Sequence, residues 1–371
     1  MSVPNPVAAA PTRAERRAAA RVSLLSLGAY VAFVVVIAVT QHGHPEWFAK
    51  FGDEGQPTVY ARIVLGDDIE VPFDEVHDGA TFWMLSRDPL IREPAILNRY
   101  AVYPAYRAQR ILYPALVAPW RLLGEQSMLW GMVITNLGVV LVGTYVTARL
   151  AQHLRAPAAV GYAFAFSPAV LVSLALDVAD GLAAACVIGV VLLVRRNRWG
   201  CSAVVGVLAV LAREQSWLAL VIIAAFAPGT RRSRLSVVVW PGLAGVLWFL
   251  YVQSRLGWGT DAPENFVVVP FKGFVDSYRF GWSPTGRMDE MVIAVLGLLL
   301  GVYVVVRFFR RRTLELAACL PFAVLEPFYA SVVLYRTLNS ARVLGPLVAL
   351  LAVDVFAEHR AKLCNSIAAA H

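Results

Sequence analysis

Long apolar segments separated by short arginine-rich stretches constrain the fold of this chain more than any other feature. A helix of about 20 apolar residues crosses the ~30 Å hydrocarbon layer of a membrane, and it satisfies its backbone hydrogen bonds internally. Apolar runs of roughly this length or somewhat shorter cover residues 22–40, 129–150, 235–253, 291–309, 316–335 and 343–356. The sequence therefore predicts an all-α protein, a polytopic transmembrane helical bundle.

Other apolar segments are interrupted. Prolines divide residues 110–123 and 156–176, so that each forms one kinked span or shorter helices. Arg213-Glu214-Gln215 break residues 201–227, which arginine runs flank on both sides. We expect this last segment to be a hairpin of short helices with both ends in the cytoplasm. The number of spans is then about nine to twelve.

The charge distribution indicates an orientation in a membrane. Hydrophobic residues make up 58% of the chain, the mean hydropathy is +0.62, and the net charge is +8. The positive charge lies in short arginine runs between apolar segments, which is the pattern of topology signals. We therefore expect no nucleic-acid partner.

The same arginine runs place both termini in the cytoplasm. Residues 1–21, which carry four arginines, form a basic cytoplasmic tail, and residues 358–371 form a second one. Residues 22–357 form a single membrane domain. No small-residue cleavage site follows residues 22–40, so we expect a retained first helix in a multi-pass plasma-membrane protein and not a signal peptide.

The first extracytoplasmic loop, residues 41–109, holds much of the acidic charge. Eleven of the 25 Asp and Glu residues fall within residues 41–99. Long loops in compact proteins are usually functional. We expect juxtamembrane helices here, one of them amphipathic, beginning near Asp78 and carrying Trp83 at headgroup depth. Residues 256–288 form a second outer loop.

Two aspartates of the first loop are candidate acids. Asp78 either caps a helix or presents its carboxylate to a lipid-borne substrate. Asp88, ten residues later, either closes the same helix or is a second acid. Nearby carboxylates could bind a divalent cation, Mg²⁺ or Mn²⁺, or form a solvated acidic loop, because their spacing matches no known ligand loop. These carboxylates are Asp67, Asp68, Glu70, Asp74 and Glu75.

Arginines near the outer ends of helices are candidate phosphate ligands. Arg107 and Arg110 are three residues apart and share a face if they lie on one helix, with Tyr113 a turn further on. A guanidinium group presents a planar fork of donors that suits phosphate. Arg342, at the outer start of the last span, is a further candidate. Headgroup contact and interface anchoring are the alternatives for these arginines.

Charged residues also occur at or within apolar helices. Asp177 and Asp180 begin one, where negative charge is favoured by the helix dipole alone. Arg213 and Glu214 stand at membrane depth, where ions pair with each other or line a polar cavity. We expect Arg110, Asp177 and Arg213 to line one outer-leaflet groove under the first loop.

These motifs together resemble the GT-C class of membrane glycosyltransferases. The chain is most similar to small actinobacterial-type members with DGxxY and YRxQRILYP motifs. The resemblance rests on His77-Asp78-Gly79 in the first loop, on RILYP at residues 110–114, on Ser167-Pro168 before Asp177, and on LAREQ at residues 211–215. Phe82 or Trp83 stands where the first motif has tyrosine.

The resemblance implies transfer of a sugar, a hexose such as mannose or a pentose, from a polyprenyl-phosphate donor to a glycan, lipid or protein acceptor. Asp78 would be the general base, with Asp88 as the second acid. The donor phosphate would contact Arg107, Arg110, Tyr113, Arg213 and Arg342. The remaining pocket residues would be His77, Asp177, Asp180 and Glu214. A transporter or lipid flippase with a midplane site, and a non-catalytic scaffold, are the competing interpretations.

Overall fold

The computed structural model describes residues 12–53, 55–67, 69, 71, 76–258, 265–280, 288–334, 339, 342 and 345–369, and these residues form an all-α protein. No strand occurs among them, and Phe266 and Tyr329 form an isolated β-bridge. Four described helices are long and apolar enough to cross a membrane, or five if one bent pair forms a single span. The four are α1 (Arg13–Thr40), α8 (Glu125–His153), α14 (Arg231–Leu256) and α16 (Met288–Arg311).

The bent pair joins η2 (Ala158–Gly161) and α9 (Tyr162–Ala165) to α10 (Pro168–Ala175) at an angle of 49°. Pro168 causes the break, because its ring fixes φ and its nitrogen donates no hydrogen bond. The apolar helices Trp199–Ala212 and Ser216–Phe226 are shorter than these candidates, and Gly345–Ala369 is long but is not among them. The expectation of nine to twelve spans therefore stays a prediction.

Helix α1 packs along α8 on one face only. Its start is fixed by a capping box in which Thr12 Oγ1 accepts from the Glu15 amide and Glu15 Oε2 accepts from the Thr12 amide, at 3.1 and 2.8 Å. On the packed face, Ser23 donates to the carbonyl of Leu141 and Tyr30 donates to that of Ala165. The opposite face exposes leucine and valine side chains, an arrangement that is compatible with a membrane protein.

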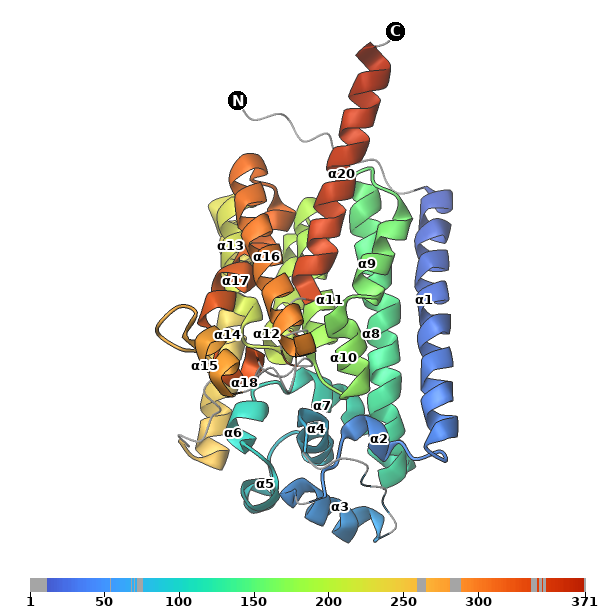
Figure 1. Ribbon diagram of the computed structural model, residues 1–371, viewed down its shortest axis with the longest axis vertical. Helices are drawn as coiled ribbons and strands as arrows, with labels where there is room; N and C mark the ends of the chain where they lie inside the picture. Colours follow the sequence, from blue (N-terminus) through green and yellow to red (C-terminus); the bar gives the residue numbers. More distant parts are fainter. Residues whose placement is uncertain are drawn as a thin grey trace.

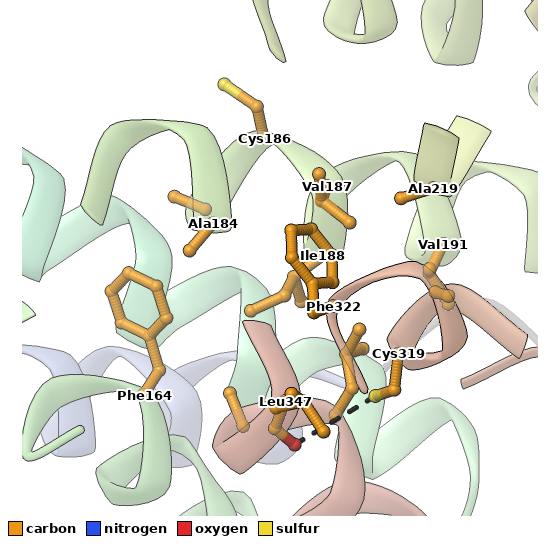
Figure 2. Packing of buried hydrophobic residues seen from close by; sticks show 14 of the residues in the cluster. Phe164, Ala184, Cys186, Val187, Ile188, Val191, Ala219, Cys319, Phe322 and Leu347 are labelled. Carbon is orange, nitrogen blue, oxygen red and sulfur yellow. Dashed lines mark hydrogen bonds between the residues drawn. The ribbon is translucent and has the colours of Figure 1, made fainter. Parts of the chain in front are cut away.

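Helix α11 (Asp180–Arg195) lies at the centre of the bundle. Thirteen of its side chains are buried, against α8 on one side and against α12 (Trp199–Ala212), α17 (Leu314–Leu325) and α20 (Gly345–Ala369) on the others. Figure 2 shows its Val187 and Ile188 with Cys319 and Phe322 of α17 and Leu347 of α20. A helix that is apolar all round is expected in such a core.

The segment at residues 201–227 has the predicted break. Helices α12 and α13 (Ser216–Phe226) are separated by three residues, and the backbone of Arg213 is extended. Gly229, after α13, lies against the indole ring of Trp199 at the start of α12. The two helices therefore form a hairpin. At 1.5 Å per residue each is about 16–21 Å long, so its tip lies inside the bundle.

Both the start of α1 and the end of α20 lie at the top of Figure 1, and a layer of short helices closes the opposite end. Cross-helix ion pairs stabilise the upper end: Arg195 bonds Glu315 at 2.7 Å, and Arg307 bonds Asp354 and Glu358 at 2.7 Å each. The layer at the lower end is continuous in sequence. It comprises α2 (Glu46–Ala49), α3 (Gln56–Leu65), α4 (Asp78–Arg87), α5 (Pro94–Tyr100), α6 (Pro104–Arg107), α7 (Leu112–Val117) and η1 (Ala118–Leu123).

Helix α4 is the core of this layer. The prediction that it is an amphipathic helix at the membrane interface is therefore wrong. Eight of its ten residues are buried, and Trp83 is 0% exposed, in contact with Phe51 and Tyr60. The sequence DGATFWMLSR has no polar face after its first residue, so the helix needs cover on all sides, and the other short helices supply it.

Candidate functional site

Seven charged side chains meet where the layer of short helices joins the bundle. They come from the start of α4, the end of α6 and the turn after it, the start of α11, the α12–α13 break and the residues just before α20. We call this group the ion network. Its members are Asp78, Arg107, Arg110, Asp180, Arg213, Glu214 and Arg342.

Asp78 is held between two arginines. Oδ1 accepts from Arg107 Nε at 2.8 Å and lies 2.6 Å from its Nη2, and Oδ2 accepts from Arg342 Nη2 at 2.7 Å. Arg110 Nη1 is 4.0 Å from the same Oδ2. His77 occupies the N-cap position of α4 without a side-chain cap bond, and Asp78 is the first helical residue. The alternative that Asp78 is merely the cap is therefore not observed.

Two further carboxylates complete the ion network. Asp180 Oδ2 accepts from Arg342 Nε at 2.6 Å, and its Oδ1 pairs with Arg213. Glu214 pairs with Arg110 at 3.3 Å. Arg342 thus bridges the aspartates of α4 and α11, which are about a hundred residues apart in the sequence.

The ion network is largely buried, with Glu214 its most exposed side chain at 34%, and it is not neutral. The side chains of Arg110 and Asp180 are each 4% exposed. Four guanidinium groups against three carboxylates leave one positive charge in excess. Burial alone would raise the pKa of Asp78, but Arg107, Arg342 and Arg110 lower it well below its usual range. Asp78 is therefore ionised at neutral pH, and the excess positive charge favours an anionic ligand.

Uncharged groups fix the arginines in place. Arg107 Nη1 donates to the carbonyl of Val102 at 2.5 Å and to Thr81 Oγ1 at 3.3 Å. Arg110 donates to the Tyr106 hydroxyl, which accepts a second bond from Asn265 Nδ2 at 2.7 Å. Thr81, Tyr106 and Asn265 were not identified from the sequence. Only Tyr106, inside the YRAQR segment, carried a local signal.

Arg107 and Arg110 do not share a helix face, although their spacing suggested it. Helix α6 ends at Arg107, and the Arg110 amide bonds the Arg107 carbonyl in the turn that follows. Pro104 begins α6 and Pro114 lies in α7, so the segment divides into two short helices. The turn directs both guanidinium groups to Asp78.

Asp177 and Tyr113 belong to a neighbouring polar cluster and not to the ion network. Asn136 Nδ2 donates to Asp177 Oδ1 at 3.2 Å and to the Tyr113 hydroxyl at 2.9 Å. Asp177 lies in the turn between α10 and α11 with φ of +48° and is fully buried. Burial raises its pKa well above the usual range, against the hydrogen bonds from Asn136 and Tyr113. Asn136, a lone polar residue in a long apolar run, was missed from sequence.

Asp88 is not brought to the ion network. It follows the last residue of α4, and its Oδ2 accepts from the Glu93 amide at 2.8 Å, where α5 begins. His77 donates its amide hydrogen to the Lys50 carbonyl at 3.2 Å. The proposed cation loop lies outside the described residues except for Asp67, and the described part of the chain has no group of three His, Cys, Asp or Glu side chains that could hold a metal ion.

A small cleft opens beside the ion network, with a volume of about 10 Å³, room for one water molecule. Asp180, Arg213 and Arg342 line its charged side, and Phe322 and Pro346 line its apolar side. Of the three residues expected to line one groove, Arg110 and Arg213 meet in the ion network, and Asp177 lies in the neighbouring cluster.

Comparison with known proteins finds no matching family model, no similar curated protein and no similar solved structure. The function is therefore argued from the ion network itself. Its chemistry is that of an anion site next to an ionised carboxylate at one end of an apolar helical bundle.

Proposed function

We propose that this protein is a multi-pass membrane glycosyltransferase that takes a sugar from a polyprenyl-phosphate donor, with the ion network as its reaction centre. The observation that carries the proposal is the convergence of four arginines on Asp78 and Asp180 from segments up to 264 residues apart. Buried ion pairs seldom stabilise a fold relative to apolar packing, so seven such groups in one place favour a functional role.

The arginines suit the phosphate of the donor. Guanidinium groups bind phosphate oxygens through two parallel hydrogen bonds, and they stay charged when buried. Next to apolar helices the local dielectric constant is low, so fixed positive charge stabilises a leaving phosphate more than it would in water. Arg213 and Arg342 line the small cleft, and Arg110 lies in the same ion network.

The reaction is a displacement at the anomeric carbon of the sugar. The acceptor hydroxyl oxygen forms a bond to this carbon, and the bond from the carbon to the phosphate oxygen breaks. The polyprenyl phosphate leaves with the bonding electron pair and is held by the arginines. The hydroxyl proton passes to the Asp78 carboxylate, because a hydroxyl group attacks poorly until a positioned base removes its proton.

Donor binding would also raise the basicity of Asp78. In its ion pairs with Arg107 and Arg342 the carboxylate is a weak base, because both cations stabilise its charged form. A phosphate that takes over bonds from these arginines reduces that stabilisation, so the pKa of Asp78 moves upward toward its ordinary value. The base then gains strength only when the donor is bound.

The orientation follows from the arginine runs between the apolar segments. The layer from α2 to α7 faces the outside, both described helix ends at the top of Figure 1 face the cytoplasm, and the reaction centre lies near the outer leaflet. This location also argues against the transporter alternative, whose site would lie at the bilayer midplane.

The test measures donor binding by the arginines. The full chain in lipid nanodiscs is titrated with a fluorescent polyprenyl-phosphate mannose, and Arg342→Lys is compared with the parent. Lysine keeps the positive charge but cannot make the bidentate hydrogen bonds of arginine, so we expect donor binding to weaken about tenfold or more.

Arg195→Lys is the matched control, since Arg195 also binds a carboxylate, Glu315, but at the opposite end of the bundle. Its donor affinity should equal that of the parent. Equal affinity of the parent and Arg342→Lys would remove Arg342 from the donor site, and no binding by the parent to mannosyl, glucosyl or arabinosyl donors would refute the proposed function.

A further inference from the structure

A second cavity, of about 360 Å³, lies within the layer of short helices, away from the ion network. Ligand sites in proteins typically have volumes of about 300–1,000 Å³, so the size suits a small organic ligand. It opens between α3, the end of α4, α5 and η1. Its lining residues are Tyr60, Met84, Arg87, Asp88, Pro89, Leu90, Arg92, Glu93, Ile96, Leu97 and Arg121.

One wall of this cavity is a rigid hydrogen-bonded group. Arg87 donates to Glu125 through Nε and Nη2 at 2.9 Å each, and its Nη1 donates to the Tyr60 hydroxyl. Arg121 Nη1 donates to the Arg87 carbonyl at 2.9 Å. The Tyr60 ring stacks on Tyr100, with centroids 5.2 Å apart. The donors and the aromatic ring of this wall are thus held in fixed positions.

The opposite wall is a strained loop that α14 holds in place. Ile91 has a φ of +50°, a conformation that a β-branched residue adopts rarely and at a cost of about 1–3 kcal/mol. Arg255 on α14 donates to the carbonyls of Ile91 and Arg92, at 2.9 and 3.0 Å, and Tyr251 donates to that of Leu90. Strain that other elements maintain in this way occurs at binding sites.

The chemistry of the lining residues selects among ligands. Three arginines and two carboxylates line the cavity, so a simple anion meets Asp88 and Glu93, and a simple cation meets Arg87, Arg92 and Arg121. A ligand with several hydroxyl groups satisfies both kinds of partner, because each hydroxyl both donates and accepts. Tyr60, Met84, Leu90, Ile96 and Leu97 add apolar surface for the C–H groups of a sugar ring.

We propose that this cavity binds a sugar unit of the acceptor. The assignment of that sugar to the acceptor rests on the proposed glycosyl transfer, whereas carbohydrate binding itself does not. Helix α4 links the two sites: Asp78 at its start belongs to the ion network, and Arg87 at its end belongs to this cavity. Nine residues at 1.5 Å each separate them by about 14 Å, a span that a short oligosaccharide covers.

Binding is measured on the full chain in nanodiscs by saturation-transfer NMR. The probes are methyl α-mannopyranoside, methyl α-glucopyranoside and methyl α-arabinofuranoside, with inorganic phosphate as the anion probe. We expect at least one glycoside to receive saturation. Leu90→Trp fills the cavity from its half-exposed rim and should abolish the signal. Asp88→Asn keeps the acceptor oxygen for the Glu93 amide, loses the charge, and should weaken binding about tenfold.

Asp53→Asn is the matched control, a surface carboxylate paired with Arg62 outside the cavity, and it should bind as the parent does. Asp78→Asn should also bind glycosides normally. If the parent protein binds a glycoside but transfers no sugar, the cavity assignment stands and the proposed function fails. No saturation of any glycoside, binding of phosphate alone, or unchanged binding in Leu90→Trp would each overturn the cavity assignment.

Discussion

Asp78 and Asp177 are the two aspartates whose surroundings contrast most. Asp78 lies among arginines, which lower its pKa against the effect of burial, whereas burial raises the pKa of Asp177, in the turn between α10 and α11, against the hydrogen bonds from Asn136 and Tyr113 and the charge of Lys50. The sequence singled out both, because each begins or precedes a helix. Their different partners were not predictable, because Arg342 and Asn136 reach them from distant parts of the chain.

The depressed pKa of Asp78 sets the pH dependence of its contribution to stability. The folded pKa lies below the unfolded value of ~3.9, so the contribution is complete above that pH and is lost as the pH falls through the folded pKa. Asp78→Asn leaves Arg107 and Arg342 without this partner and should cost about 3 kcal/mol at pH 7. The melting temperatures of the variant and the parent should draw together as the pH falls below ~3.9; a gap that widens in acid would contradict this.

Asp177 should behave in the opposite way. Its folded pKa is raised, so its contribution is complete below pH ~3.9 and is lost as the pH rises through the folded pKa. Asparagine resembles a protonated carboxyl group and tolerates positive φ, so Asp177→Asn should stay within about 1 kcal/mol of the parent at pH 6. The stability of the variant relative to that of the parent should then increase as the pH rises. Melting curves from pH 5 to pH 9 measure this, and a large loss independent of pH would show that the carboxylate is needed in ionised form.

Helix α4 and the α12–α13 hairpin are the elements that build the ion network. The break at Arg213 was predictable, because charged residues interrupt an apolar run and arginines flank both ends. The burial of α4 was not, because its cover comes from short helices that lack strong periodicity on their own. From the sequence alone, Phe82 and Trp83 could be aromatic residues at a membrane interface or core residues. Their packing in the structure shows that they are core residues.

The position of α4 depends on Gly79. A Cβ atom there would meet the Leu176 carbonyl and lie 2.8 Å from the Ala49 carbonyl, and neither backbone atom can rotate away. Gly79→Ala should therefore displace the start of α4 and move Asp78 away from its arginines. We expect the free energy of unfolding to fall by about 1–3 kcal/mol, and we expect donor binding to be lost.

Gly138→Ala is the control, because nothing lies within 4 Å of that position in α8. Alanine there should stabilise the helix by up to about 1 kcal/mol. Melting temperature and donor affinity of the two variants measure the difference. Parent-like values for Gly79→Ala would mean that α4 does not dock as closely as described.

In the whole molecule, the ion network lies where the layer of short helices joins the bundle, and the ion pairs of Arg195 and Arg307 lie at the opposite end. The all-α class and the long apolar helices followed from hydropathy, and the helices are compatible with a membrane protein. The sequence could not place Asp180 beside Arg342, 162 residues away, because single-sequence patterns carry no information on such contacts.

The proposed orientation is tested by cysteine labelling in intact cells. Exposed Cys201 and Cys364 are first replaced by serine, because they would react as background. A cysteine at Gln56, in α3, should react with an impermeant maleimide, and a cysteine at Asn197, in the turn after α11, should react only after the membrane is opened. Labelling of position 197 from outside would invert or refute the topology.

Sugar transfer at the ion network with Asp78 as base, as proposed, can be measured by a transfer assay in nanodiscs. Labelled polyprenyl-phosphate sugar and an acceptor glycan are incubated with the parent, with Asp78→Asn, and with Glu315→Gln. The last variant breaks a comparably buried ion pair, that of Arg195, away from the site, and so controls for lost stability. The account predicts transfer by the parent and by Glu315→Gln, and a rate about 10²-fold lower for Asp78→Asn. Transfer by Asp78→Asn at the parental rate would contradict it.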